Sequence, residues 1–207
     1  SKMTTGWFEQ GGSTYCLSAP NGNMLASAWV DDENGHRWLG SDGALVATVS
    51  GNRIVYADAS HAPASGLTTI GDAVYYADPE TGLLKGGEIT CEDGKVREFD
   101  ESTYVAVSKW YTDQGGNWRY LKNGLDASGW VLINTTWYYL DSSTGVMLTG
   151  WQKIGGSWYW LECWGGMRKG WLYDEGSWYY LSGSGAMVTG WYEVSDYIYQ
   201  FASSGRM

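Results

Sequence analysis

The sequence contains little proline, cysteine, histidine or positive charge. Its 207 residues include 3 prolines, 3 cysteines and 2 histidines. The 13 basic side chains are outnumbered by 23 acidic ones, which gives a net charge of −10. So few cations argue against a nucleic-acid partner, because phosphate binding needs a basic face. No apolar run reaches the roughly 18 residues of a membrane-spanning helix, so we expect no membrane insertion.

The cysteines and histidines form no recognisable chemical site. Cys16, Cys91 and Cys163 are odd in number and widely spaced, which argues against a disulfide framework and against zinc. A Cys91–His61 or Cys16–His36 dyad would lack a third group to orient it. We therefore expect no catalytic residue, no metal and no cofactor. The first residues lack the apolar segment of a signal peptide, so we expect a mature fragment of a longer protein.

Aromatic residues and glycine are abundant instead. The chain has 14 tryptophans, 16 tyrosines and 30 glycines, but only 3 phenylalanines. Tryptophan and tyrosine combine a flat apolar face with a polar edge, which suits half-exposed binding surfaces better than an ordinary core.

The aromatic residues recur with a regular period, which is the mark of a repeat architecture. The leading tryptophans are Trp110, Trp130, Trp151, Trp171 and Trp191, at nearly constant intervals along the chain. The last four are each followed, one half-period later, by an apolar residue: Leu140, Leu161, Leu181 and Phe201. Met147, Met167, Met187 and Met207 recur at the same interval. A fainter version of the pattern extends toward the N-terminus, for example in IVYAD at 54–58 and VYYAD at 74–78.

Each unit reads as a β-hairpin followed by a connector. Segments such as WYYL favour strands, and DSSTG or SGSG predicts the turn that follows. Because a unit this short cannot bury a core alone, we expect neighbouring hairpins to stack. The fold class is therefore all-β, a β-solenoid of about ten stacked hairpin repeats. We expect divergent repeats over 1–106 and well-matched repeats over 107–207, within one continuous solenoid.

The pattern GW-x(5–6)-WYY/WL-x(3–4)-GxM resembles the choline-binding, or cell-wall-binding, repeat family. The likeness is close over 110–207 and loose over 1–109. That family occurs on surface proteins and murein hydrolases of Gram-positive bacteria and their phages. In it, choline lies between consecutive hairpins in a cage of aromatic rings. Such rings are natural partners for a quaternary ammonium, which cannot donate ordinary hydrogen bonds.

Alternate residues of a strand share a face, so the first and third aromatics of WYY should point the same way. The resemblance then implies three complete cages, each built from a leading tryptophan, the first aromatic of the same unit and the third aromatic of the next. They are Trp110, Trp118 and Tyr139; Trp130, Trp137 and Trp160; and Trp151, Trp158 and Tyr180. A fourth set, Trp171 and Trp178, meets Gln200 where the closing ring should lie, so we expect a weak or empty site there.

Two features of this interpretation stay open. The methionines either line the cage floors or pack the turns, and packing is the preferred interpretation. The aromatic period can also arise from a purely structural inner stack. In the N-terminal half, Ile54, Val74 and Val96 stand where a cage tryptophan belongs. We expect residues 1–106 to be a scaffold or a separate interaction surface, with Trp7, Trp29 and Trp38 as the exceptions to examine.

The predicted function is non-catalytic anchoring to a bacterial cell surface through choline on cell-wall teichoic acids. The expected location is therefore outside the cell, at the cell wall. One alternative is a carbohydrate-binding module for a glucan or host glycan, in which Gln152, Asn134, Asp141 and Glu162 would hydrogen-bond the sugar. Another is an adhesin that binds a protein through an apolar patch on the third to fifth units.

Overall fold

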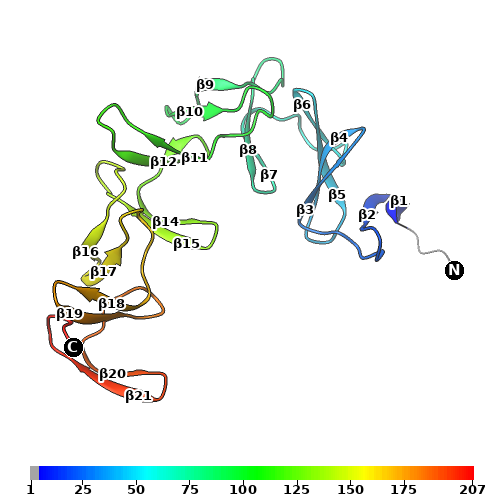
Figure 1. The fold of residues 1–207 in the computed structure, drawn as a ribbon. Coiled ribbons are helices and arrows are strands. Elements are labelled where there is room, and N and C mark those ends of the chain that lie inside the picture. Colours follow the sequence, from blue (N-terminus) through cyan, green and yellow to red (C-terminus); the bar gives the residue numbers. More distant parts are fainter. Residues whose placement is uncertain (1–4) are drawn as a thin grey trace. The chain divides into compact units, whose positions relative to one another are not determined.

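A computed structural model describes residues 5–207 as a series of β-hairpins joined by turns (Figure 1). The described residues contain no helix, and hence none long and apolar enough to cross a membrane. The expectation of an all-β chain is confirmed. The hairpins form because β-formers alternate with glycine-rich turns throughout the chain.

The first ten strands lie in the N-terminal half. They are β1 (Gly6–Gln10), β2 (Ser13–Leu17), β3 (Ala28–Asp32), β4 (Gly35–Leu39), β5 (Leu45–Ser50), β6 (Arg53–Tyr56), β7 (Gly66–Ile70), β8 (Ala73–Ala77), β9 (Gly87–Thr90) and β10 (Val96–Phe99). Strands β3 to β6 form a four-stranded sheet, and the others pair as two-stranded hairpins.

The remaining strands follow the same plan. They are β11 (Lys109–Thr112), β12 (Trp118–Lys122), β13 (Leu125–Asp126), β14 (Gly129–Ile133), β15 (Thr136–Leu140), β16 (Gly150–Ile154), β17 (Ser157–Leu161), β18 (Gly170–Asp174), β19 (Ser177–Leu181), β20 (Gly190–Val194) and β21 (Tyr197–Phe201). From β14 onward, consecutive strands pair as antiparallel hairpins.

In several hairpins a glycine faces a buried apolar residue across the strand pair. Gly129 pairs with Leu140, and Gly150 and Gly170 pair with Leu161 and Leu181 in the same way. The three leucines are fully buried. The glycines have φ between 71° and 81°, which other residues adopt only at a cost. The glycine before Trp130, Trp151 and Trp171 therefore turns the chain into the hairpin, and the leucine opposite it belongs to the core.

A repeated backbone hydrogen bond stacks one hairpin on the next. The amide of Met147 donates to the carbonyl of Trp118 at 2.8 Å. The same bond recurs from Met167 to Trp137, from Met187 to Trp158 and from Met207 to Trp178. Ala106 donates to Val74 at 2.7 Å in the N-terminal half, at the corresponding positions. The expected stacking of hairpins is therefore present in well-matched and divergent repeats alike.

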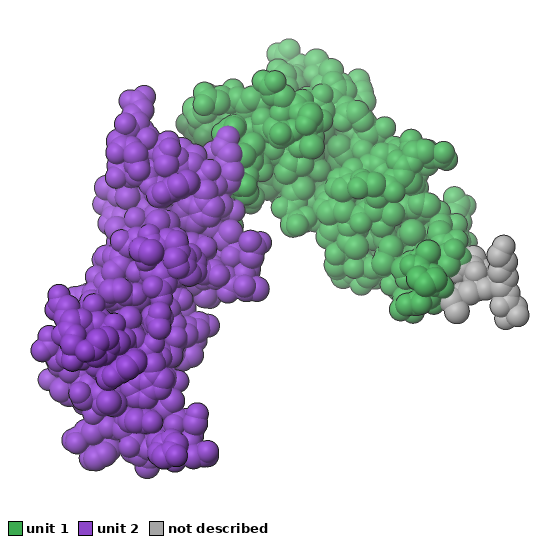
Figure 2. All heavy atoms as spheres, viewed as in Figure 1, with its two compact units in different colours: residues 1–108, 122–125 green, residues 109–121, 126–207 purple. Residues whose placement is uncertain are grey.

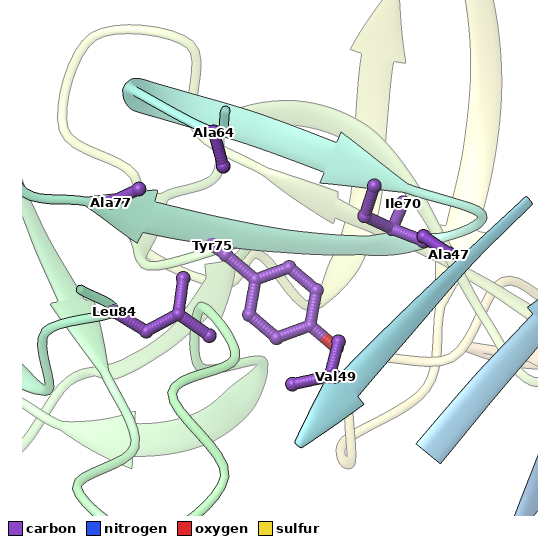
Figure 3. Packing of buried hydrophobic residues seen from close by; sticks show 7 residues of the cluster. All are labelled: Ala47, Val49, Ala64, Ile70, Tyr75, Ala77 and Leu84. Atoms are coloured by element: carbon purple, nitrogen blue, oxygen red, sulfur yellow. The ribbon is translucent and has the colours of Figure 1, made fainter. Parts of the chain in front are cut away.

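The chain divides into two compact units (Figure 2). Unit 1 comprises the residues up to 108 together with 122–125, and unit 2 comprises 109–121 and 126–207. Unit 1 contains a conventional core in which Tyr75 is only 1% exposed. Its ring lies near Val49 and Leu84, with Ala47 and Ile70 in the same cluster (Figure 3). Burial raises the pKa of Tyr75 to about 12, because the ionised phenolate is poorly solvated there.

Side-chain hydrogen bonds reinforce the connector turns. Ser143 and Thr144 each donate both a backbone amide and a hydroxyl to Asp141. These donors stabilise the ionised carboxylate and lower the pKa of Asp141 to about 2. Asp100 makes the same set of contacts with Ser102 and Thr103. These turns, of the pattern Asp-x-Ser-Thr, therefore fix the chain where it leaves one hairpin for the next.

Candidate binding sites between hairpins

Four pairs of tryptophans form nearly perpendicular corners in unit 2. In each pair the leading tryptophan meets the first aromatic of its own returning strand. The pairs are Trp110–Trp118, Trp130–Trp137, Trp151–Trp158 and Trp171–Trp178, with ring planes 83–90° apart and centroids 6.0–6.5 Å apart. The second tryptophan of each pair is 39–50% exposed. An indole that served only the core would not leave so much of its surface in water, so these corners suit a ligand.

A tyrosine from the next hairpin closes each corner. Tyr138 lies 5.0 Å from Trp110, and Tyr159 lies 4.9 Å from Trp130, measured between ring centroids. The same contact joins Tyr179 to Trp151 at 4.9 Å and Tyr199 to Trp171 at 4.8 Å. We number these four sets as the first to fourth sites, in chain order. Each site thus takes two rings from one hairpin and one ring from the next.

The closing ring differs from the one that strand alternation predicted. The prediction was the third aromatic of the next unit: Tyr139, Trp160 and Tyr180 for the first three sites. Those rings instead pack on the leading tryptophans of their own hairpins, at 5.0, 5.5 and 5.1 Å from Trp130, Trp151 and Trp171. The middle aromatic leaves the strand on the opposite face, and that is the face toward the preceding hairpin. The predicted third wall is therefore wrong in its geometry.

The fourth site gains its third ring by the same rule. Gln200 lies opposite Trp191 within its own hairpin, at the position of Tyr139 and its counterparts. The residue that reaches Trp171 is Tyr199. Trp171, Trp178, Tyr199 and Met207 line a hollow of about 330 Å³. The reason given for a weak fourth site, a missing ring, does not hold.

Methionine side chains form part of three of the sites. Met147 lines the first site, Met167 the second and Met207 the fourth. The same side chains also pack on the following turns: a Cβ added to Gly165 or Gly185 would lie 2.3 Å from the sulfur of Met147 or Met167. Both open interpretations of the methionines are therefore met at once. In the last three Gly-x-Met turns, Gly165, Gly185 and Gly205 make room for the methionine of the repeat before.

The turn two hairpins further along completes the wall of the first two sites. Cys163 and Trp164 line the first site, which has a volume of about 330 Å³. Gly183 and Ser184 take the equivalent positions at the second site, of about 360 Å³. Lys169 also lines the second site. No sequence signal links these turns to tryptophans two hairpins earlier, and the prediction omitted them.

A carboxylate orients one of the leading tryptophans. Asp174, in the following hairpin, accepts a hydrogen bond of 3.0 Å from the indole Nε1 of Trp151. This bond orients an indole that also packs against the buried cluster of Leu172, Tyr179 and Leu181. Among the described residues, no group of three or more histidine, cysteine or acidic side chains could hold a metal ion.

The tryptophans of unit 1 are covered by other side chains. The guanidinium of Arg37 lies 4.5 Å from the ring centroid of Trp7. Arg37 pairs with Val30 as Tyr138 pairs with Val131, so it stands at the closing-ring position. An internal cation thus lies on the face that an aromatic ring covers in unit 2.

The other two tryptophans named as exceptions are also occupied. Trp29 is stacked on His36 at 4.1 Å, with ring planes 3° apart, and its Nε1 donates to Asp72 at 2.9 Å. Trp38 packs on Trp29 and on the backbone of Gly71.

Between residues 45 and 108, the large apolar side chains that are well exposed are Val46, Val55 and Val96.

The cysteine–histidine dyads considered from sequence have no support in unit 1. Cys16 and Cys91 are buried, and burial raises the pKa of the Cys16 thiol, which opposes formation of a nucleophilic thiolate. His36 is paired with Asp31 and stacked on Trp29, while His61 packs on Tyr56.

Comparison with known proteins identifies the repeats. Residues 148–190 match the choline-binding repeat, and residues 128–147 match the cell wall binding repeat. Choline binding protein F of Streptococcus pneumoniae has a similar solved structure. It shares 27% identity at a TM-score of 0.50, over 98% of this chain and 86% of that one.

Two curated relatives are glucosyltransferases. Glucosyltransferase-S of Streptococcus mutans is 33% identical over 120 residues, which cover 57% of this chain. Glucosyltransferase-I of Streptococcus downei is 30% identical over 112 residues, or 53% of this chain. The matched regions are only 7% and 6% of the lengths of those enzymes.

Proposed function

We propose that the chain is a non-catalytic module that binds choline on a bacterial cell wall, because residues 148–190 match the choline-binding repeat and residues 128–147 match the cell wall binding repeat. We further propose that this choline is carried by teichoic acid and is bound outside the cell. Any catalytic activity of a longer parent protein would belong to another domain. The single observation that carries the proposal is the recurring corner of two indole faces closed by a tyrosine.

The chemistry of these corners fits a quaternary ammonium. Each brings three aromatic rings together, and at the first, second and fourth sites a methionine side chain adds a further apolar wall. A trimethylammonium group needs such faces, because its charge is spread over methyl groups that are not ordinary hydrogen-bond donors. The ligand-binding residues we propose are Trp110, Trp118 and Tyr138; Trp130, Trp137 and Tyr159; Trp151, Trp158 and Tyr179; and Trp171, Trp178 and Tyr199.

The repetition of the sites supports a polymeric target. One cation–π contact contributes about 0.5–2 kcal/mol, so three rings give roughly millimolar affinity. Several sites on one molecule can gain about 10²–10⁴-fold in avidity on a polymer that carries many cholines. The net charge of −10 further favours a cationic headgroup. Weak individual sites in a row are therefore consistent with an anchor.

The glucosyltransferase relatives favour a second candidate, a glucan-binding module. Sugars also stack on tryptophan and tyrosine, but they need polar side chains at the rim for their hydroxyls. At the second site Lys169 and Ser184 are such groups. At the fourth site the lining is Trp171, Trp178, Tyr199 and Met207, which leaves a sugar few partners.

Titration of tryptophan fluorescence with three ligands tests the proposal. We expect saturation with choline at millimolar concentration. We expect a much weaker response to ethanolamine, which has the same charge but no methyl groups. Glucose oligomers form the third arm. A response to the oligomers without one to choline would replace the first candidate by the second, and equal responses to choline and ethanolamine would contradict a site built for methylated nitrogen.

A further inference from the structure

We propose that Trp164 is a fourth aromatic wall of the first site and makes that site bind a quaternary ammonium more tightly than the second. This inference rests on the proposed function and assigns an order of affinity to its sites. Trp164 belongs to the turn after β17, two hairpins beyond Trp110 and Trp118. Its ring lies 6.0 Å from Tyr138 at 74°, edge to face.

The absence of a side chain at Gly166 lets Trp164 fold back into the site. A Cβ at Gly166 would lie 2.0 Å from the ring atoms Cη2 and Cζ3 of Trp164. Gly166 bridges Tyr138 just as Ala186 bridges Tyr159 in the next repeat. Thus the first site combines a tryptophan with a glycine, where the second combines Ser184 with Ala186. The two changes act together, because the indole needs the space that alanine would fill.

The position of Trp164 is unlike that of a core residue. Its side chain is 57% exposed although it lines the first site. The ring of Trp164 therefore lies at the site and outside the core, where a bound cation can contact it. Its removal should therefore leave the fold intact.

The second site contains a lysine, Lys169, which should weaken the binding of a cation there. Lys169 lines it, whereas the residue at the same place in the preceding repeat is Thr149. A nearby ammonium opposes a second cation by Coulomb repulsion. A fourth ring at the first site and a lysine at the second both predict that the first site fills at lower choline concentration. One added cation–π contact corresponds to about a three- to tenfold difference in dissociation constant.

Cys163 allows occupancy of the first site to be read directly. It is exposed and lines the site, whereas Cys16 and Cys91 are buried. Bound choline should slow alkylation of Cys163 by iodoacetamide. Gly183→Cys provides the matched thiol at the second site, since Gly183 has the equivalent position and no atom within 4 Å of an added Cβ. Peptide mass spectrometry then reports both protection midpoints from one protein.

We expect Cys163 to be protected at about three- to tenfold lower choline concentration than the introduced thiol. Trp164→Ser should reduce that advantage to the part that Lys169 causes, and so should Gly166→Ala, which keeps the tryptophan but displaces its ring. Ser184→Trp combined with Ala186→Gly should tighten the second site, whereas Ser184→Trp alone should not. Circular dichroism checks that each variant folds.

The outcomes separate this inference from the proposed function. If choline protects neither thiol, the proposed function fails. Equal midpoints for the two thiols that Trp164→Ser does not alter would overturn the role of Trp164 while choline binding stands. Lys169→Thr completes the set: if this change alone makes the two sites equal, the lysine and not Trp164 sets the order, and the inference is wrong.

Discussion

Tyr159 and Trp160 are neighbours in β17, and their side chains leave the hairpin on opposite faces. Tyr159 lines the second site with Trp130 and Trp137. Trp160 faces Trp151 within its own hairpin and contacts the buried cluster around Leu172 and Leu181. At the scale of single residues, one ring lines the candidate site and the adjacent ring packs against the buried core.

Alanine substitutions separate these two roles. We expect Tyr159→Ala to weaken choline binding at the second site by about three- to tenfold, because one cation–π contact is lost. Trp160→Ala should instead lower the free energy of unfolding, by up to about 3–5 kcal/mol for loss of a packed ring. Protection of the thiol introduced by Gly183→Cys measures the first effect, and urea unfolding measures the second. Greater loss of binding from Trp160→Ala in the folded protein would restore the third-aromatic assignment.

At Trp7, an arginine takes the place of the closing tyrosine found in unit 2. Arg37 stands at the register position of that tyrosine, and its guanidinium covers Trp7. Arg97 and Arg119 occupy the same register position in their hairpins. Each of the three arginines is paired with an aspartate: Asp32, Asp93 or Asp113. Tyrosine holds the same register position in two other hairpins of unit 1, at Tyr15 and Tyr75, so a tyrosine there does not by itself mark a well-matched repeat.

At the scale of elements, the Gly-x-Met turn couples each hairpin to the one before it. Gly185 has φ of 85° and lies against the sulfur of Met167, which lines the second site. Gly176, in the tight turn of β18–β19, has a similar φ of 78° but no atom within 4 Å of an added Cβ. Both glycines therefore have a positive φ, but only Gly185 lies against a methionine side chain.

This pair provides a matched test of the coupling. We expect Gly176→Ala to lower the free energy of unfolding by about 1–2 kcal/mol, the cost of a left-handed conformation in a residue with a Cβ. Gly185→Ala should cost more and should also weaken choline binding at the second site, because Met167 must move. Urea unfolding and the choline titration measure the two effects. Equal values for the two variants would show that the methionine contact is dispensable.

At the scale of the whole molecule, the same hairpin plan carries two kinds of surface. Both units use the inter-hairpin hydrogen bond, as in Ala106–Val74 and Met167–Trp137. Only the repeats of unit 2 combine that bond with an open corner of aromatic rings among the described residues. Stacking of hairpins therefore does not require an open aromatic corner, and we expect stacking and cation binding to be separable properties of the repeat.

Hydrogen exchange with and without choline tests this separation. We expect choline to slow exchange of amides within 126–207, since a ligand at 100 times its dissociation constant stabilises a site by about 2.7 kcal/mol. Amides of residues 5–108 should exchange at unchanged rates. Mass spectrometry of peptides from each unit provides the readout, with ethanolamine as the ligand control. Slower exchange around Trp7 or Trp29 would reveal a cation site in unit 1.

The sequence by itself determined the hairpin period, the buried positions and the tryptophan corners. Those features depend on contacts within one repeat, such as Leu140 opposite Gly129 and Trp137 beside Trp130, and local alternation predicts them. Only the tertiary structure decided what closes each corner. The way one hairpin is set on the next selects Tyr159 over Trp160 and Tyr199 over Gln200. It also brings Trp164 to tryptophans two hairpins earlier, a contact that follows from stacking and leaves no mark in the period of a single repeat.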